Sequence, residues 1–411
     1  MGKNDDRVID ITPDVKWVGI LDYDITTFDI VMTTEYGTTY NSFFINAEKK
    51  ALIEVAKEKF WDVYIKKIQE VTDPSEIEYI ILDHTEPDHS GSLGHLLELA
   101  PDATVVGSGN AIRYLADIVN KPFRSMIVKD GDTLDLGNKT LKFISAPNLH
   151  WPDSIYTWLV EDKVLFTCDS FGAHYCTENI FSELTPDYLK AFNYYFDVIL
   201  KPFSRFMVRA IEKITPLEPL VICPGHGPVH RDTINEIIAL SLKLSNDYLR
   251  LTAGGDKKRV LVAYVSAYGF TGQAAELIAE GIRSEDGFIT DVADIEHIAA
   301  TELDLKISSA DAILAGSPTI NQNTLLPIYT LFALINPLRD RGKVAGAFGS
   351  YGWSGEAPKI ILDNFRNLKL KTFDETAGFK FAPGGDKKES LIEFGKKFAR
   401  KVEEESVREE K

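Results

Sequence analysis

The chain has 411 residues, of which 44% are hydrophobic and 26% are charged, and its net charge is -17. The length predicts two or three domains of about 150 residues each, and the composition is that of a globular protein. The strong negative charge argues against nucleic acids and anionic membrane surfaces as partners, and no apolar run approaches the roughly 20 residues that span a bilayer.

The amino terminus and the cysteines indicate the compartment. Residues 1–7 lack the apolar core of a signal peptide. The cysteines are Cys168, Cys176 and Cys223, and they form no C-x-x-C pair, so the sequence predicts neither a disulfide framework nor a thiolate metal site. A reducing, cytoplasmic setting is the simplest interpretation, and no rubredoxin-like module is expected in this chain.

Residues 8–250 are expected to form one α/β unit. Short strands are predicted at residues 17–21 and 39–45, and helices at residues 51–71 and 93–100. Strands and helices continue to alternate through this part of the chain, as an α/β sandwich requires.

Four potential metal ligands lie within residues 84–89, just after an apolar run at residues 79–82 that predicts a buried strand. A strand end and the turn after it can direct neighbouring side chains at one point. Imidazole with carboxylate suits iron, manganese or zinc. A polar loop with two solvated histidines is the simpler alternative. The four side chains are His84, Glu86, Asp88 and His89.

Three further candidates follow other short apolar runs. His150 comes after residues 141–144, Asp169 after residues 164–168, and His226 after residues 220–223. One histidine at a strand end is more often structural than a ligand. Strands stacked in a sheet place such ends along one rim, however, so four segments with complementary ligand types favour a common metal site.

The H-x-E-x-D-H motif at residues 84–89, followed by His150, Asp169 and a Pro-Gly-His-Gly segment around His226, resembles the metallo-β-lactamase fold. Glu86 stands where hydrolases of that fold usually carry histidine, and this variant resembles the flavodiiron protein family. A carboxylate there favours iron over zinc. The resemblance implies an αββα sandwich with two irons, in which Asp169 is the bridge that a two-metal site needs. It places His84, Glu86 and His150 on one iron, and Asp88, His89 and His226 on the other.

Other polar and aromatic residues of this part have simpler interpretations. Gly107-Ser108-Gly109 lacks the third glycine of a dinucleotide fingerprint. Tyr195 lies in an aromatic, helix-like stretch in which core packing is the simpler role, although the resemblance makes it a candidate proton donor. Trp151 is expected to pack over the site or against a partner subunit. His95, His174 and His230 are expected at the surface or beside the ligands, and His297 is expected to be exposed.

A second α/β unit follows a predicted linker at residues 251–258, so the expected domains are residues 1–252 and 253–411. Its first strand, residues 260–265, is a continuous apolar run typical of a parallel strand covered on both faces. A final amphipathic helix is expected from Lys387. The charged residues 403–411 are expected to form a frayed tail.

Three loops of this unit follow predicted strands. Residues 266–272 precede a helix, where hydroxyls and N–H groups make a phosphate site, although such a loop alone is often only a helix cap. This loop resembles the flavodoxin phosphate loop. Ligands of doubly wound parallel sheets bind at the carboxyl ends of the strands, so we expect FMN there. The candidate FMN contacts are Ser266, Ala267, Tyr268, Gly269, Phe270, Thr271, Ser317, Pro318, Thr319, Ile320, Asn321, Ser350, Tyr351, Gly352, Trp353, Ser354 and Gly355.

The resemblance covers nearly the whole chain and implies a reductase of dioxygen to water, of nitric oxide to nitrous oxide, or of both. It also implies a head-to-tail homodimer, in which the flavin of one subunit faces the irons of the other, and a separate rubredoxin-like electron donor. Two alternatives stay open. One is a dinuclear zinc hydrolase fused to a flavodoxin domain, and the other is an electron carrier whose first domain is only a scaffold.

Overall fold

The computed structural model describes residues 7–29, 32–253 and 255–409. The first six residues, expected to hold no signal peptide, and Gly254 of the predicted linker lie outside this range. The chain divides into two compact units, the first ending at Tyr248 and the second beginning at Leu249. This junction and the proposed boundary after Thr252 both lie in one helix, α7 (Ile234–Thr252).

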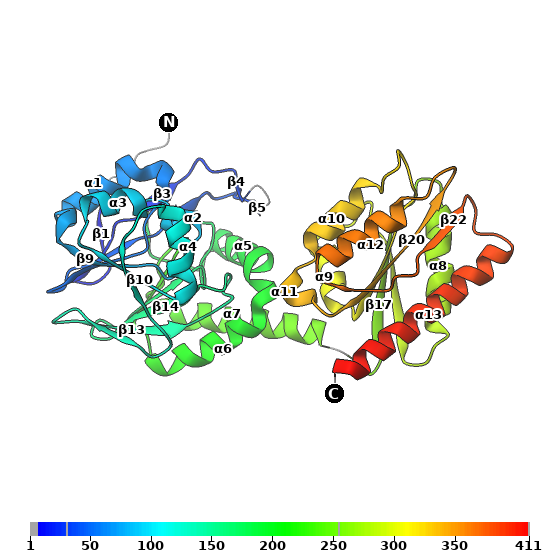
Figure 1. Ribbon diagram of the computed structural model, residues 1–411. Coiled ribbons are helices and arrows are strands. Elements are labelled where there is room, and N and C mark those ends of the chain that lie inside the picture. The colour runs from blue at the N-terminus through cyan, green and yellow to red at the C-terminus, as the bar shows by residue number, and fades with distance from the viewer. Residues whose placement is uncertain (1–6, 30–31, 254, 410–411) are drawn as a thin grey trace. The chain divides into compact units, whose positions relative to one another are not determined.

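Two sheets form the centre of the first unit (Figure 1). The larger sheet has the order β1 (Ile9–Asp10), β2 (Val15–Trp17), β7 (Phe43–Ile45), β8 (Lys50–Ile53), β9 (Ile77–Ile81), β10 (Thr104–Gly107) and β11 (Arg124–Ile127). The smaller has the order β12 (Thr133–Asp135), β13 (Thr140–Ser145), β14 (Ile155–Leu159), β15 (Val164–Cys168) and β16 (Val221–Pro224). Two short ladders pair β3 (Ile20–Asp22) with β6 (Thr38–Tyr40) and β4 (Thr27–Phe28) with β5 (Met32–Thr33).

Each sheet packs against the other sheet on its inner face and against helices on its outer face, through apolar side chains. Residues such as Phe43 and Phe166 fill the space between the sheets. Helices α1 (Trp61–Val71), α3 (Leu93–Leu99) and α4 (Gly109–Val119) cover the outer face of the larger sheet. Helices α5 (Pro186–Tyr195), α6 (Ser204–Ile214) and α7 cover the smaller one. The expected αββα sandwich is therefore confirmed.

Some boundaries predicted from the sequence are wrong. The helix expected at residues 51–71 begins only at Trp61, because Ala51, Leu52 and Ile53 lie in β8 and are fully buried between β7 and β9. The spacing of their apolar residues is helical, but packing between two neighbouring strands overrides this local preference. The strand expected at residues 17–21 is split into β2 and β3.

The second unit is a sheet of parallel strands with helices on both faces (Figure 1). Its order is β18 (Phe288–Asp294), β17 (Lys258–Tyr264), β19 (Ala312–Gly316) and β20 (Val344–Tyr351), and the last strand pairs with both β21 (Lys371–Thr372) and β22 (Ala377–Lys380). This is the flavodoxin-like order. One face carries α8 (Phe270–Arg283) and α13 (Asp386–Glu409). The other carries α9 (Ala300–Ser309), α10 (Leu326–Leu334) and α12 (Ala357–Asn367), and α11 (Pro337–Asp340) precedes β20.

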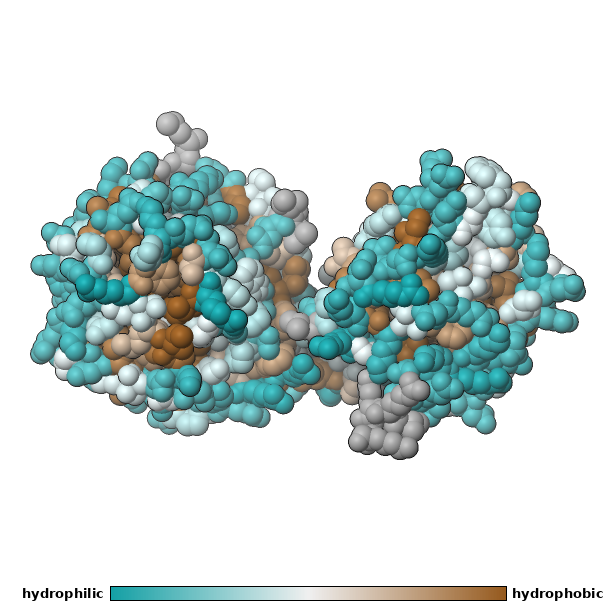
Figure 2. All heavy atoms as spheres, viewed as in Figure 1, coloured by the Kyte–Doolittle hydropathy of each residue, from teal (hydrophilic) through white to brown (hydrophobic). Residues whose placement is uncertain are grey.

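The surface and the carboxyl terminus add two findings. Hydrophilic residues cover most of the visible surface of each unit (Figure 2). The frayed tail expected at residues 403–411 is wrong as far as the structure describes it, since α13 continues to Glu409. Among the described residues, no helix is both long and apolar enough to cross a membrane.

Candidate metal centre and flavin-binding loops

The H-x-E-x-D-H motif spans the turn after β9 and the start of the short helix α2 (Pro87–Ser90), so Asp88 and His89 lie in this helix. Pro87 at the first position of this helix has no N–H to leave unsatisfied. The turn is held from behind by Glu54, whose Oε1 accepts the backbone N–H groups of Asp83 at 2.9 Å and His84 at 3.2 Å. Glu54 directly follows β8, so a side chain at the end of β8 fixes the backbone that follows the neighbouring strand β9.

The first group of ligand atoms comes from His84, Glu86, His150 and Asp169. Glu86 Oε2 lies 3.3 Å from His84 Nε2 and 3.1 Å from His150 Nε2. Asp169 Oδ2 lies 3.6 Å and 3.4 Å from the same two nitrogens. Two carboxylates thus converge with two imidazole nitrogens on one small volume.

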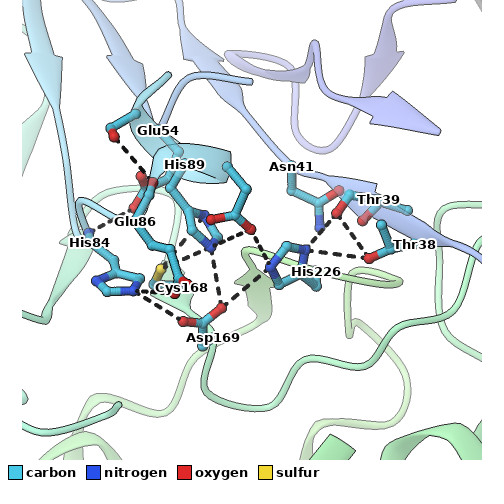
Figure 3. A network of polar contacts seen from close by, with 12 residues as sticks. Thr38, Thr39, Asn41, Glu54, His84, Glu86, His89, Cys168, Asp169 and His226 are labelled. Carbon is cyan, nitrogen blue, oxygen red and sulfur yellow. Dashed lines mark hydrogen bonds and ion pairs between the residues drawn. The ribbon is translucent and has the colours of Figure 1, made fainter. Parts of the chain in front are cut away.

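The second group comes from Asp88, His89 and His226. His226 Nε2 lies 3.0 Å from Asp88 Oδ2, and His89 Nε2 lies 3.5 Å from the same oxygen. The other oxygen of Asp169, Oδ1, lies 3.3 Å from His89 Nε2 and 3.6 Å from His226 Nε2. One carboxylate therefore faces each group with a different oxygen, as Figure 3 shows for Asp169 between His84 and His226. This is the geometry of a bridging ligand.

The far sides of two of these imidazoles are fixed by hydrogen bonds. His84 Nδ1 lies 3.2 Å from Asp153 Oδ2, which also accepts the N–H of Thr85 at 2.8 Å. His226 Nδ1 donates to the carbonyl of Thr39 at 2.6 Å. Carboxylates and carbonyls at this position leave Nε2 free for a metal and set the ring orientation.

The charges of the group also fit a cation site. Burial alone would lower the pKa of His150, but bonds to Asp169 and Glu86 raise it to about 9. Burial would raise the pKa of Asp169, yet the histidines around it hold that pKa well below its usual range. Asp88 Oδ1 is buried without a hydrogen bond, and Asp169 Oδ2 has only long contacts of 3.4 and 3.6 Å to imidazole nitrogens. Buried carboxylate oxygens without close partners are costly, and a pair of divalent ions would satisfy them, so the residues present fit the expected irons.

Three side chains border this group. The Tyr195 hydroxyl, 1% exposed, donates to Asp169 Oδ1 at 3.0 Å. His174 is buried, and its ring lies 5.1 Å from that of His226. Partial desolvation of the Asp29 carboxyl and the nearby charge of Glu86 raise the pKa of Asp29 to about 6. Sequence reasoning missed Asp29, which lies in a loop with no strand or helix pattern.

The remaining histidines and Trp151 lie as follows. Trp151 packs edge-on against His84, with ring centroids 5.1 Å apart. His230 is fully buried and lies 2.9 Å from the Phe171 carbonyl. His95 stacks on Trp61, and His297 is 88% exposed. At residues 107–109, Ser108 caps the start of α4 by accepting the N–H of Ala111.

Sequence reasoning also missed the buried acids behind the ligands. Glu54 was assigned to a predicted helix, although it stands at a strand end like the other candidates. Asp153 follows His150 after only two residues, and Asp83 directly precedes the motif. Burial raises the pKa of Asp83 to about 8 and the pKa of Glu54 well above its usual value.

The predicted flavin loops lie at the carboxyl ends of β17, β19 and β20, the edge at which doubly wound sheets bind ligands. Ser266 Oγ is buried without a hydrogen-bond partner beside the start of α8. Gly269 precedes that helix with φ +81°, a conformation that favours glycine. An unpaired hydroxyl at a helix N-terminus fits a phosphate group. The helix starts at Phe270, so Phe270 and Thr271 belong to its first turn.

The two later loops place polar and aromatic groups at the same edge. Ser350 and Tyr351 are the last two residues of β20 rather than part of the loop after it, because that strand is longer than predicted. Ser350 Oγ is 2.9 Å from the Thr271 hydroxyl, and this hydrogen bond links the end of β20 to the start of α8. Tyr268 and Trp353 are 82% and 85% exposed. Large aromatic side chains left in solvent at a ligand edge suit the face of a flavin ring.

Comparison with known proteins agrees with both units. A family model described as ODP family beta lactamase matches residues 38–227, and one described as Flavodoxin matches residues 262–395. The Flavo-diiron protein FprA2 of Clostridium acetobutylicum is 40% identical, over 96% of this chain and 99% of that protein. The Type A flavoprotein fprA of Rhodobacter capsulatus is 36% identical, over 95% and 90%.

Solved structures give the same result. The rubredoxin oxygen:oxidoreductase of Desulfovibrio gigas has a TM-score of 0.66 at 27% identity, covering 97% of this chain and 99% of that one. The flavodiiron protein of Giardia intestinalis has a TM-score of 0.64 at 28% identity, covering 98% of both chains. The chain belongs to the flavodiiron protein family, and it is an oxidoreductase whose cofactors are FMN and a non-haem diiron centre.

Proposed function

We propose that this protein reduces dioxygen to water, nitric oxide to nitrous oxide, or both, with electrons relayed through FMN. The observation that carries the proposal is the gathering of His84, Glu86 and His150 on one side of Asp169, and of Asp88, His89 and His226 on the other. Such a cage of nitrogen and oxygen ligands suits two irons that share a carboxylate.

When bound, the two irons and the FMN supply the electrons that a small diatomic substrate takes up. The protein's own residues do the rest. Asp169 holds both halves of the centre in one geometry, and the bonds from Asp153 and Thr39 orient two of the histidines. Burial of Asp169 and the histidines keeps bulk water away from most of the centre.

Reduction of either gas consumes protons, and Tyr195 is our candidate for holding one. Its hydroxyl points at Asp169 Oδ1 from 3.0 Å, and it is 1% exposed. Burial and the charge of Asp169 raise the pKa of Tyr195 well above its usual value, so the hydroxyl keeps its proton in the resting protein. A general acid must lie within hydrogen-bond reach of its target.

The hydrolase alternative is less well supported. A zinc hydrolase has no use for a flavin-binding unit, and Glu86 makes the centre more anionic and harder than an all-histidine set. Elemental analysis separates the two, since about two iron atoms per chain are expected from the ligand set. Two zinc atoms and no iron in protein purified from cells supplied with both metals would favour the hydrolase.

We also propose the partners and the setting. A separate rubredoxin-like protein is the proposed electron donor, because the similar Desulfovibrio gigas protein is a rubredoxin oxygen:oxidoreductase. A head-to-tail homodimer is proposed to bring the flavin of one subunit to the irons of the other. Cys168, Cys176 and Cys223 form no disulfide, which suits a reducing cytoplasm.

The experiment is a direct comparison of the two gases. The protein is reduced without oxygen, and its turnover of dioxygen and of nitric oxide is then measured side by side at equal donor concentration. Consumption of at least one gas, without release of peroxide from dioxygen, supports the proposal. Iron-loaded and flavin-loaded protein that consumes neither gas would refute it, and the sedimentation coefficient of the active species tests the homodimer.

A further inference from the structure

A second group of potential ligands lies immediately behind the predicted iron pair. Glu54, His89 and Cys168 have ligand atoms within 4.8 Å of one another, and each side chain is about 2% exposed or fully enclosed. They come from the ends of β8 and β15 and from α2. Figure 3 shows the three side chains next to Glu86 and Asp169.

Two polar atoms of this group lack a good partner. Glu54 Oε1 accepts two backbone N–H groups, but Oε2 is buried and accepts nothing. As a carboxylate, Oε2 is an unpaired buried acceptor, and as an acid it is an unused donor, and both are costly. The Cys168 sulfur lies 3.8 Å from His89 Nδ1 and 4.0 Å from Nε2, which is a weak contact at best.

The backbone holds Cys168 in this position at a cost. Its φ is +45°, a left-handed conformation that a cysteine rarely adopts. Its carbonyl accepts the N–H of Gly225 at 2.5 Å, and a Cβ on Gly225 would collide with the ring of His89. The left-handed backbone of Cys168 and the missing Cβ of Gly225 thus together allow the thiol to approach the imidazole of His89.

This group differs from the iron pair in its thiol, Cys168. A thiolate with an imidazole and a carboxylate is a softer set, of the kind that binds zinc. Two ligands on one tetrahedral zinc, at about 2.3 Å for sulfur and about 2.0 Å for nitrogen, lie about 3.6 Å apart. The observed separation of 3.8 Å between Cys168 Sγ and His89 Nδ1 is close to this value, but Nε2 lies at 4.0 Å, so the imidazole ring must turn before the Nδ1 lone pair points toward the sulfur side.

His89 belongs to both groups. Its Nε2 lies 3.3 Å from Asp169 Oδ1, on the side of the predicted irons, whereas Nδ1 is the nitrogen nearer to Cys168. A neutral imidazole has one lone pair available, because the other nitrogen carries a proton. It can therefore serve one of the two groups at a time.

We propose that Glu54, His89 and Cys168 form a zinc-selective pocket that competes with the second iron for His89. Binding of Zn²⁺ forms a zinc–sulfur bond and releases the Cys168 thiol proton to solvent, with no change of oxidation state. Excess zinc then displaces one iron from the pair. The identity of the displaced metal rests on the proposed function, whereas the binding of zinc to this pocket does not.

The test uses the holoprotein with its FMN and metals, incubated with one equivalent of zinc per chain and freed of unbound metal. X-ray absorption at the zinc edge is expected to show one sulfur neighbour at about 2.3 Å. Metal analysis is expected to show one zinc gained and one iron lost per chain. No zinc uptake, or zinc with only nitrogen and oxygen neighbours, overturns the pocket without the need for any variant.

Matched variants assign the sulfur. Cys168→Ser is expected to lose the sulfur neighbour, whereas Cys176→Ser, which changes a half-buried cysteine of the same unit, keeps it. A sulfur neighbour retained in C168S overturns the assignment. Glu54→Gln serves as a second variant should C168S fail to fold, with weaker zinc uptake expected. Sulfur-bound zinc in a protein that reduces neither gas would leave the pocket standing and remove only the proposed function, whereas sulfur-bound zinc with both irons kept refutes the competition.

Discussion

The two units prepare their ligand sites in different ways. In the first unit, side chains such as Asp169 and His84 are buried and already held by Tyr195 and Asp153. In the second unit, Tyr268 and Trp353 stand largely in solvent at the edge of the sheet. The metal centre is therefore built into the core of the fold, whereas the flavin edge is completed by its ligand. Changes in the first unit should consequently have larger effects than comparable changes in the second.

The largest effect is expected for Asp169→Ala. Asp169 faces both ligand groups, so its loss should release iron and lower gas reduction by more than the roughly 10–100-fold that loss of an outer partner costs. The bound FMN should stay, because its loops belong to the other unit. Iron content, flavin absorbance and turnover measure the three quantities. Asp232→Ala, at an exposed aspartate, is the control. If D169A keeps two irons and full turnover, Asp169 is not the bridging ligand.

A second effect concerns acid stability and separates the units. His230 is fully buried, and burial lowers its pKa from 6.5 to about 4. Between these pH values the unfolded chain binds a proton at this residue that the folded chain does not. The contribution of His230 to the free energy of unfolding of the first unit should therefore be complete above pH 6.5. It should be lost as the pH drops toward 4, which lowers that free energy by up to about 3 kcal/mol.

The second unit offers the internal contrast for this prediction. The histidine of the second unit, His297, is 88% exposed, so this unit has no buried imidazole that could produce the same dependence. Denaturant unfolding followed from pH 7 to 4.5 checks both units. His230→Gln should flatten the slope of the first transition, and His297→Gln should leave both transitions unchanged. An unchanged slope in H230Q would show that other groups carry the acid sensitivity.

The same difference between the units explains what the sequence could and could not predict. The seven candidate ligands could be selected from the sequence because each follows a short apolar strand, and strand ends in a sheet meet at one rim; the structure brings their side chains together. Glu54 was missed because residues 51–71 have helical spacing, which hid the end of β8. Its bonds to Asp83 and His84, like the approach of Cys168 to His89, join segments far apart in the chain. No local pattern records such contacts, since tertiary packing alone creates them.

An intermediate effect is expected for Tyr195→Phe. The change removes only the hydroxyl that donates to Asp169 Oδ1. Loss of such an outer partner typically costs about 10–100-fold in activity or metal affinity. Turnover should fall in this range while both irons remain, and a change in the pH profile of turnover would mark a role in proton supply. Tyr194→Phe, at the exposed neighbouring tyrosine, should leave turnover unchanged. Normal turnover in Y195F would show that the Tyr195 hydroxyl has no role in turnover and that the side chain serves only core packing.

The smallest effect is expected for Trp353→Ala, on the flavin side. Trp353 is 85% exposed, so its removal leaves no cavity in the core and should not alter the stability of the unit. Stacking of one aromatic ring on another contributes about 0.5–1.5 kcal/mol beyond its buried area, so its loss should weaken FMN binding by roughly 2- to 12-fold. Titration of flavin-free protein with FMN, followed by quenching of flavin fluorescence, measures this change.

Leu220→Ala, at an exposed apolar residue of the first unit, is the control for Trp353→Ala and should bind FMN as the natural chain does. The iron content of W353A should also be unchanged, because the metal centre is held by contacts within its own unit. An FMN affinity equal to that of the natural chain would exclude Trp353 as the ring contact. A parallel loss of iron would contradict the independence of the two sites, which is the physical reason for ranking this effect last.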